Sequence, residues 1–289
     1  MGIDWRGVFF FWVCVMAASD SKSGADVWSV GGVELSSRLL LGTARYPSPQ
    51  VLGEAIAASG AQVVTVGLRR QMAPDGGGEN VFVQMVRTAL KEHGAQLLPN
   101  TAGCTSAREA VQLAHMAREL YGTPWVKLEV VGDDYTLQPD MQQLLQAAQA
   151  LVREGFVVFP YCTDDLVGCR RLLDAGCPLL MPWGAPIGSG QGLLNPFALR
   201  LLRERLPDAT LIVDAGIGAP SHAAQALEMG FDAVLINSAV SYSPDPVRMA
   251  GAFRHAVQAG RAAYLAGIMA RQDFAQPSTP VTGQPFLIG

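Results

Sequence analysis

Lys127 is the residue whose type and position most clearly suggest chemistry. The chain has only three lysines against eighteen arginines, and Lys127 lies in an alternating apolar run, residues 125–130, that is typical of a buried strand. Arginine keeps its proton at ordinary pH and forms no imine, whereas a desolvated lysine can lose its proton and form one. One interpretation is therefore that Lys127 is required for its reactive nitrogen and not only for its charge. The other is structural: a snorkelling strand-end lysine, or a buried ion pair with Glu129.

Two carboxylates are expected near this amine. Glu129 follows Lys127 by two positions, so both side chains point to the same face of the strand, while residues 126, 128 and 130 point to the other. Asp214 ends another apolar run and precedes a glycine-rich turn, where an Asp is often a helix cap. Since Ser221 is expected to cap the next helix, Asp214 is free to face inward. An amine beside carboxylates forms either a structural ion pair or a proton shuttle.

Two glycine-rich turns resemble anion cradles. One spans residues 186–192 and includes Gly188; the other spans residues 215–218, and Asn237 and Ser238 follow one unit later. Glycines let backbone N–H groups converge on phosphate oxygens, and a following helix N-terminus adds a favourable dipole. The amine, the carboxylates and the cradle together describe an enzyme that forms a Schiff base with a sugar phosphate.

Such chemistry requires an amine that is neutral part of the time. The reference pKa of lysine is ~10.4, and each unit of lowering demands about 1.4 kcal/mol. Burial lowers the pKa of Lys127, whereas an ionised Glu129 raises it. The sequence leaves open which effect is larger.

Strand–helix alternation repeats about eight times, which predicts a parallel sheet. Eight such units favour a single-domain (β/α)₈ TIM barrel, an α/β fold, over an open doubly wound sheet, because no G-x-G-x-x-G follows the first strand. Functional groups are then expected at the C-terminal ends of the strands, with phosphate sites after strands seven and eight. The candidate strands are residues 38–42, 63–67, 96–99, 126–130, 156–160, 179–181, 211–214 and 233–236.

The chain ends are expected to lie outside the barrel, which we place at residues 27–271. Residues 1–26 contain an apolar stretch, residues 7–18, that matches a signal-peptide core in length but is too short to span a bilayer. The segment before this stretch lacks the positively charged region typical of a signal peptide, so a spurious upstream start explains residues 1–26 equally well. Residues 246–270 are expected to form the helix that closes the barrel, and residues 272–289 are a proline-rich tail.

Composition limits the class of partner and site. The net charge is −4, and basic residues form no run longer than a pair, which indicates no nucleic-acid partner. The five cysteines have no C-x-x-C spacing and form no metal-ligand motif with the histidines, so we expect no metal, no cofactor, and reduced thiols in the cytoplasm. Cys162 could act as a nucleophile, but we favour packing.

Seven motifs, in order, resemble the bacterial thiazole synthase of thiamine biosynthesis over roughly residues 27–270. They are RLLLGT (38–43), LPNTAGC (98–104), VKLEV (126–130), PYCTDD (160–165), PIGSGQG (186–192), VDAGIG (213–218) and NSAV (237–240). The apolar leader and the proline-rich tail are not typical of the family. The position of Ser238 more usually holds Thr, which keeps the hydroxyl.

The resemblance implies a (β/α)₈ barrel that builds thiazole phosphate from 1-deoxy-D-xylulose 5-phosphate, dehydroglycine and the thiocarboxylate of a sulfur-carrier protein. It implies that Lys127 forms the imine and that Glu129 and Asp214 are the acid/base groups. It also implies a homo-oligomer, a tetramer by analogy. The sugar-phosphate contacts that it implies are Gly188, Ala215, Gly216, Asn237 and Ser238.

Two other functions remain open at this point. A lysine-dependent aldolase acting on a sugar phosphate would share the imine but would need no carrier protein. A non-catalytic phosphate-ligand barrel would keep Lys127 and Glu129 as a structural ion pair, and its ligand would bind without forming a reducible adduct.

Overall fold

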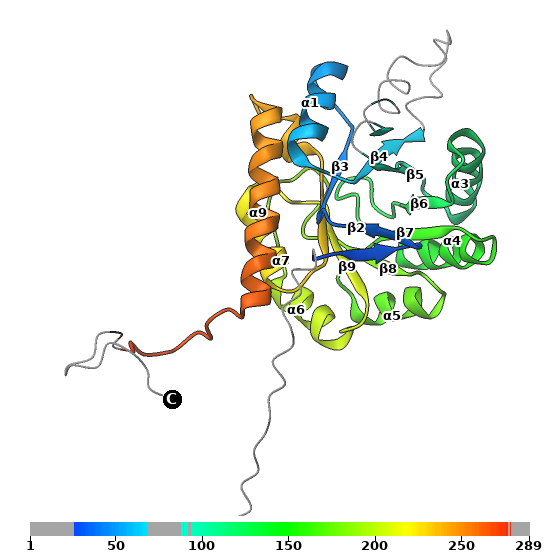
Figure 1. Ribbon diagram of the computed structural model, residues 1–289. Coiled ribbons are helices and arrows are strands. Elements are labelled where there is room, and N and C mark those ends of the chain that lie inside the picture. The colour runs from blue at the N-terminus through cyan, green and yellow to red at the C-terminus, as the bar shows by residue number, and fades with distance from the viewer. Residues whose placement is uncertain (1–25, 69–87, 89, 92–93, 277, 279–289) are drawn as a thin grey trace, which may run out of the picture.

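A computed structural model describes residues 26–68, 88, 90–91, 94–276 and 278 (Figure 1). Eight parallel strands close into a barrel in the order β10-β3-β4-β5-β6-β7-β8-β9, which confirms the predicted TIM barrel over the open sheet. Closure depends on pairing between the first and the last barrel strand, with Leu40 of β3 opposite Leu235 of β10. The apolar leader and most of the proline-rich tail lie outside the described residues.

Each predicted strand is present, with ends that differ by a few residues. The barrel strands are β3 (Leu39–Gly42), β4 (Val63–Gly67), β5 (Gln96–Asn100), β6 (Trp125–Leu128), β7 (Val157–Cys162), β8 (Leu179–Pro182), β9 (Thr210–Asp214) and β10 (Ala233–Ile236).

Helices flank the barrel and begin at residues suited to capping. For example, Asn195 accepts a hydrogen bond from the Ala198 N–H at 3.2 Å at the start of α6. No helix in the described part of the chain is both long enough and apolar enough to cross a bilayer. The helices are α1 (Pro49–Ser59), α3 (Ala107–Tyr121), α4 (Met141–Arg153), α5 (Leu166–Asp174), α6 (Pro196–Arg205), α7 (Pro220–Glu228), α8 (Ser238–Ser241) and α9 (Pro246–Ala266).

Alternation along the strands divides the core into two parts. Val126, Leu128 and Val130 pack against the helices in the larger apolar cluster, while Trp125 and Phe159 belong to a smaller cluster that fills the barrel interior. The period-2 pattern therefore leaves the interior side of β6 to Lys127 and Glu129, as predicted.

A two-stranded hairpin that the sequence reading did not predict covers one end of the barrel. β1 (Trp28–Val30) pairs antiparallel with β2 (Val33–Leu35), and Figure 1 shows the hairpin across the barrel opening. Its turn residues Gly31 and Gly32 have φ values of 55° and 81°, the positive values that a two-residue hairpin turn requires. Side chains from both strands join the interior cluster, so the hairpin closes the floor beneath the site.

Two predicted helix ends were wrong. The sequence placed the cap of α7 at Ser221, but the helix begins at Pro220 and its cap position is Ala219, which makes no side-chain cap hydrogen bond. Proline is favoured at the first helical position because its φ is already helical and its missing N–H has no partner there anyway. The last helix ends at Ala266 instead of Ala270, where Gly267 turns out of the helix with φ 84°.

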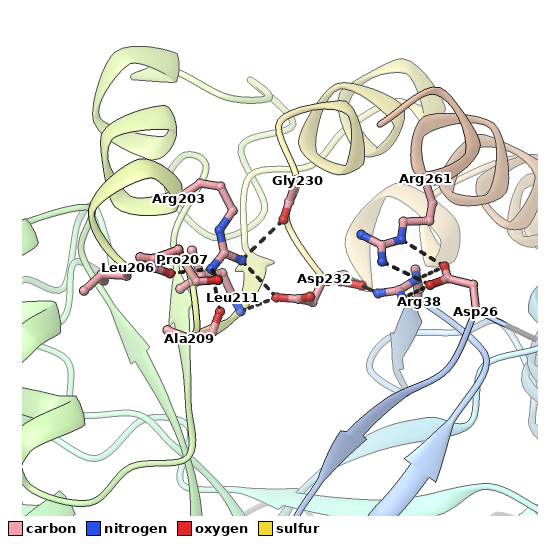
Figure 2. A network of polar contacts seen from close by, with 10 residues as sticks. All are labelled: Asp26, Arg38, Arg203, Leu206, Pro207, Ala209, Leu211, Gly230, Asp232 and Arg261. Atoms are coloured by element: carbon pink, nitrogen blue, oxygen red, sulfur yellow. Dashed lines mark hydrogen bonds and ion pairs between the residues drawn. The ribbon is translucent and has the colours of Figure 1, made fainter. Parts of the chain in front are cut away.

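Figure 2 shows the polar contacts that tie the first described residue to the barrel. Asp26 pairs with Arg38, which precedes β3, at 2.8 Å and with Arg261 of α9 at 2.9 Å. Arg38 also donates to the Asp232 carbonyl oxygen, just before β10. Segments from both ends of the described chain are thereby joined at the seam where the barrel closes.

Candidate active site

Lys127 lies between two carboxylates inside the barrel. Its Nζ is 2.6 Å from Asp214 Oδ2 and 3.0 Å from Glu129 Oε1. All three residues are buried, with exposed fractions of 5%, 3% and 5% for Lys127, Asp214 and Glu129. Asp214 Oδ2 has no aligned hydrogen-bond partner in the described chain, so its contact with Nζ is an ion pair by distance. The structure brings together the three residues that the sequence assigned to catalysis.

Hydrogen bonds from a neighbouring loop hold the end of β6 in place. The Glu129 N–H donates to Thr101 Oγ1 at 2.8 Å, and the Thr101 N–H donates to the Lys127 carbonyl oxygen at 3.1 Å. The Thr101 hydroxyl is also 2.8 Å from the Glu129 carbonyl oxygen and can donate to it. Because the backbone on both sides of Leu128 is fixed in this way, the amine and the carboxylate of this strand project inward together.

Burial and charge act in opposite directions on Lys127. Burial lowers the pKa of the amine, whereas attraction to the Asp214 and Glu129 carboxylates raises it, and the net direction is upward. Burial raises the pKa of the Asp214 carboxyl, while Lys127 lowers it and Glu129 raises it, and the net direction is again upward. On the question left open by the sequence, the net rise in pKa favours the ammonium form of Lys127 in the unliganded site. Imine formation therefore requires that a proton first leave it.

The two glycine-rich turns pack against each other beside this cluster. A Cβ added to Gly218 would lie 2.3 Å from the Gly190 carbonyl oxygen, so the turns touch through their backbones. The Gly192 N–H donates to the Gly216 carbonyl oxygen at 2.8 Å. Ala215 has a φ of 70°, an uncommon value for a residue with a side chain. The close contact requires glycine at position 218 and fixes the main chain next to Asp214.

A cavity of about 670 Å³ opens at the C-terminal ends of the strands, a volume that suits a small-molecule ligand. Gly216 follows β9 and Ser238 follows β10, the seventh and eighth barrel strands, as the sequence predicted. All eight predicted site residues line the cavity. They are Lys127, Glu129, Asp214, Gly188, Ala215, Gly216, Asn237 and Ser238.

Arg45, Tyr46 and Tyr161 are among the residues at the site that were not predicted. Arg45 lines the cavity with a φ of 65°, and its Nη1 donates to the Tyr242 hydroxyl oxygen at 2.9 Å. Tyr46 also lines the cavity, and its hydroxyl is buried without a hydrogen-bond partner in the described chain. Tyr161 of β7 lies in the barrel interior near Lys127. Strand alternation from Phe159 was the available signal for Tyr161; none pointed to the unusual backbone of Arg45.

Cys162 does not belong to this site. Its side chain lies in the cluster facing the helices, and its Sγ is 3.9 Å from Cys169 Sγ. Burial raises the pKa of the Cys162 thiol well above its ordinary value, which disfavours the nucleophilic thiolate. The described residues contain no group of three or more His, Cys, Asp or Glu side chains arranged to hold a metal ion.

Comparisons with known proteins extend this picture. The sequence model of the family described as "Thiazole biosynthesis protein ThiG" matches residues 29–280. The thiazole synthase of Coxiella burnetii (strain Dugway 5J108-111) is 58% identical over 262 residues, which cover 91% of this chain and 99% of the relative. The chain belongs to the thiazole synthase family. Another thiazole synthase, from Nitrobacter winogradskyi, is 60% identical over 253 residues, with coverages of 88% and 95%.

Solved structures agree with this assignment. A chain of the Amycolatopsis orientalis BexX/CysO complex matches with a TM-score of 0.76 and 29% identity, covering 85% of this chain and 98% of that one. The 3-hexulose-6-phosphate synthase of Salmonella typhimurium, at 17% identity and a TM-score of 0.52, shares the fold alone. Membership in the thiazole synthase family supports thiazole formation for thiamine biosynthesis over both the aldolase and the non-catalytic barrel.

Proposed function

We propose that this thiazole synthase family member forms thiazole phosphate through an imine on Lys127. Its substrates are 1-deoxy-D-xylulose 5-phosphate, dehydroglycine and the thiocarboxylate of a sulfur-carrier protein. The observation that carries the proposal is the buried Lys127 amine, placed between two carboxylates in a cavity lined by glycine-rich turns. A neutral amine in such a cavity is a suitable nucleophile for a ketone.

The first step is proton transfer out of the ammonium. Asp214 is 2.6 Å from Nζ, and its raised pKa makes its carboxylate a better base than an exposed Asp. The neutral amine then attacks the ketone carbon, and the ketone oxygen leaves as water. The protonated imine withdraws electrons and makes the hydrogen on the adjacent carbon acidic.

Proton transfers by Glu129 and Asp214 then complete the rearrangement. A carboxylate removes the acidic proton from the adjacent carbon, a proton is added to the former imine carbon, and the hydroxyl on the adjacent carbon loses its proton, so that the carbonyl now lies at that neighbouring carbon. The sulfur of the carrier adds at that carbon, dehydroglycine condenses, and water is lost as the ring closes. Two carboxylates on opposite sides of one amine can serve successive transfers without moving the backbone.

The sugar phosphate is held by the main chain of the loops after the last two strands. Ala215 and Gly216 follow β9, and Asn237 and Ser238 follow β10. Gly188 comes from the neighbouring turn, where a Cβ would lie 3.7 Å from the Ser238 hydroxyl oxygen. Binding one end of the substrate here positions its ketone for Lys127, which lowers the entropic part of the barrier.

The proposal includes a protein partner and an assembly. A sulfur-carrier protein would deliver its C-terminal thiocarboxylate through the open end of the cavity. The similar BexX structure is a complex with a second protein, CysO, which supports a protein partner at this fold. We further propose a cytoplasmic homo-oligomer, a tetramer by analogy with the family.

Intact-protein mass spectrometry tests the imine. Incubation with 1-deoxy-D-xylulose 5-phosphate and borohydride should add the mass of the reduced sugar phosphate to the wild type. Lys127→Arg should fold normally, because it keeps the cation between the carboxylates, and should give no adduct. Lys91→Arg, an exposed lysine, is the matched control and should label like the wild type. Undiminished labelling of Lys127→Arg would exclude Lys127 as the imine residue.

A further inference from the structure

Tyr161 lies beside the catalytic cluster without a role in the reaction as described above. It is fully buried on the interior side of β7, and the register that pairs Leu128 with Pro160 places it level with Glu129, the first residue after the adjacent strand β6. Lys127 Nζ is 5.6 Å from the centroid of its ring. The phenol is therefore close to the cluster but is not part of the cavity wall.

A donor without a partner and an acceptor that depends on Lys127 alone both lie in this part of the interior. The Tyr161 hydroxyl is buried and has no hydrogen-bond partner in the described chain, and Asp214 Oδ2 is buried with only the 2.6 Å ion pair to Lys127 Nζ. A buried unsatisfied polar group costs roughly 1–3 kcal/mol. Phenylalanine would fill the same space without that cost. The hydroxyl is thus a feature that packing alone does not explain.

The number of N–H donors on Lys127 changes during the reaction. An ammonium has three donors, enough for contacts with both Glu129 and Asp214. When the amine becomes a protonated imine, the ketone oxygen leaves as water with two of the three ammonium hydrogens. The imine nitrogen keeps one N–H, so it can serve only one carboxylate. The other is left buried and without a donor.

We propose that Tyr161 is a positioning residue whose hydroxyl donates to Asp214 Oδ2 once Lys127 has become an imine. The inference rests on the proposed imine. Burial, followed by the Asp214 and Glu129 carboxylates, raises the pKa of the Tyr161 phenol, so it keeps the proton that it must donate. By replacing the lost N–H, the hydroxyl keeps Asp214 ionised and oriented for the next proton transfer.

Tyr161→Phe, compared with the wild type in the full-length protein, tests this role. We expect a folded protein with an unchanged or higher melting temperature, because an unsatisfied hydroxyl is removed. Borohydride trapping with 1-deoxy-D-xylulose 5-phosphate should be about tenfold slower, the scale of a lost hydrogen bond to a charged group. Tyr135→Phe, at a tyrosine that is 94% exposed, is the matched control and should behave like the wild type.

The pH profile separates positioning from a merely structural effect. Asp214 is faced by Lys127 of β6, by Glu129 immediately after β6 and by Tyr161 of β7. Without the phenol, the ionised form of Asp214 is less stabilised in the imine state and its pKa rises, so the acidic limb of the overall rate should move to higher pH. If the wild type forms the trapped adduct and Tyr161→Phe traps at the same rate with the same pH profile, the role of Tyr161 is overturned and the proposed function is not. Failure of the wild type to trap would overturn the proposed function, and this inference with it.

Discussion

Lys127 carries a positive charge in a place where the proposed chemistry needs a neutral amine. The Asp214 carboxylate contributes more than Glu129 to raising its pKa, against the opposing effect of burial. The same carboxylate that holds the proton on the amine is also the nearest group able to take it, at 2.6 Å. In the proposed mechanism, the ion pair is therefore the resting state from which the reactive amine forms when a substrate carbonyl arrives.

Asp214→Asn tests this assignment of charge. Removing the carboxylate leaves burial to act on Lys127 with less opposition, so the pKa of the amine falls. The pH at which imine trapping reaches half its maximum should therefore move to lower pH than in the wild type, measured by borohydride trapping across a pH series. Glu129→Gln should shift the midpoint in the same direction by less. A midpoint that stays in place or rises in Asp214→Asn would contradict the account.

At the scale of elements, the proposed function assigns sugar-phosphate binding to the glycine-rich turns. Gly218→Ala would place a methyl group 2.3 Å from the Gly190 carbonyl oxygen, too close to be accommodated without separating the turns. We expect the sugar-phosphate concentration for half-maximal trapping to rise at least about tenfold, and the free energy of unfolding to fall by roughly 1–3 kcal/mol, as in other overpacked sites.

Gly251→Ala is the control for this substitution. Gly251 lies inside α9, and an added Cβ would meet no atom within 4 Å. Alanine is favoured over glycine in a helix interior, so this variant should be more stable by about 0.5–1 kcal/mol with unchanged trapping. Equal sugar-phosphate affinity in both variants would show that the turns do not hold the ligand.

How far the sequence predicted these elements depended on whether the signal was local. The inward direction of Lys127 and Glu129 followed from the period of a strand, and it was confirmed. The distance from Lys127 to Asp214 depends on closure of the whole barrel, which no local pattern encodes. The hairpin was not predicted because its strands are only three residues each, too short for a periodic signal. The cap at Ser221 was wrong because Pro220 already begins the helix.

At the scale of the molecule, Asp26 fastens the two ends of the described chain across the barrel seam. Its carboxylate accepts hydrogen bonds from Arg38 and Arg261 (Figure 2). The hydrogen bond from Arg261 lowers the pKa of Asp26 most; burial opposes it, and Arg38 lowers it further, to about 2. Arg38 lies next to β3 and Arg261 lies in α9, so the contact connects elements that are far apart in the sequence.

Asp26→Asn should therefore reduce stability in a pH-dependent way. A carboxyl whose pKa is lower in the folded state than in the unfolded state stabilises the fold at pH values above the unfolded-state pKa. This contribution is lost as the pH falls through the folded-state pKa. Because the side chain is partly exposed, solvent screening reduces the expected loss at pH 7 to about 1 kcal/mol. Thermal unfolding should show a lower melting temperature at pH 7 and a difference that shrinks between about pH 4 and pH 2. Asp208→Asn, at an exposed position, is the control and should show neither effect. A loss of stability in Asp26→Asn that does not depend on pH would mean that the charge of Asp26 does not join the chain ends.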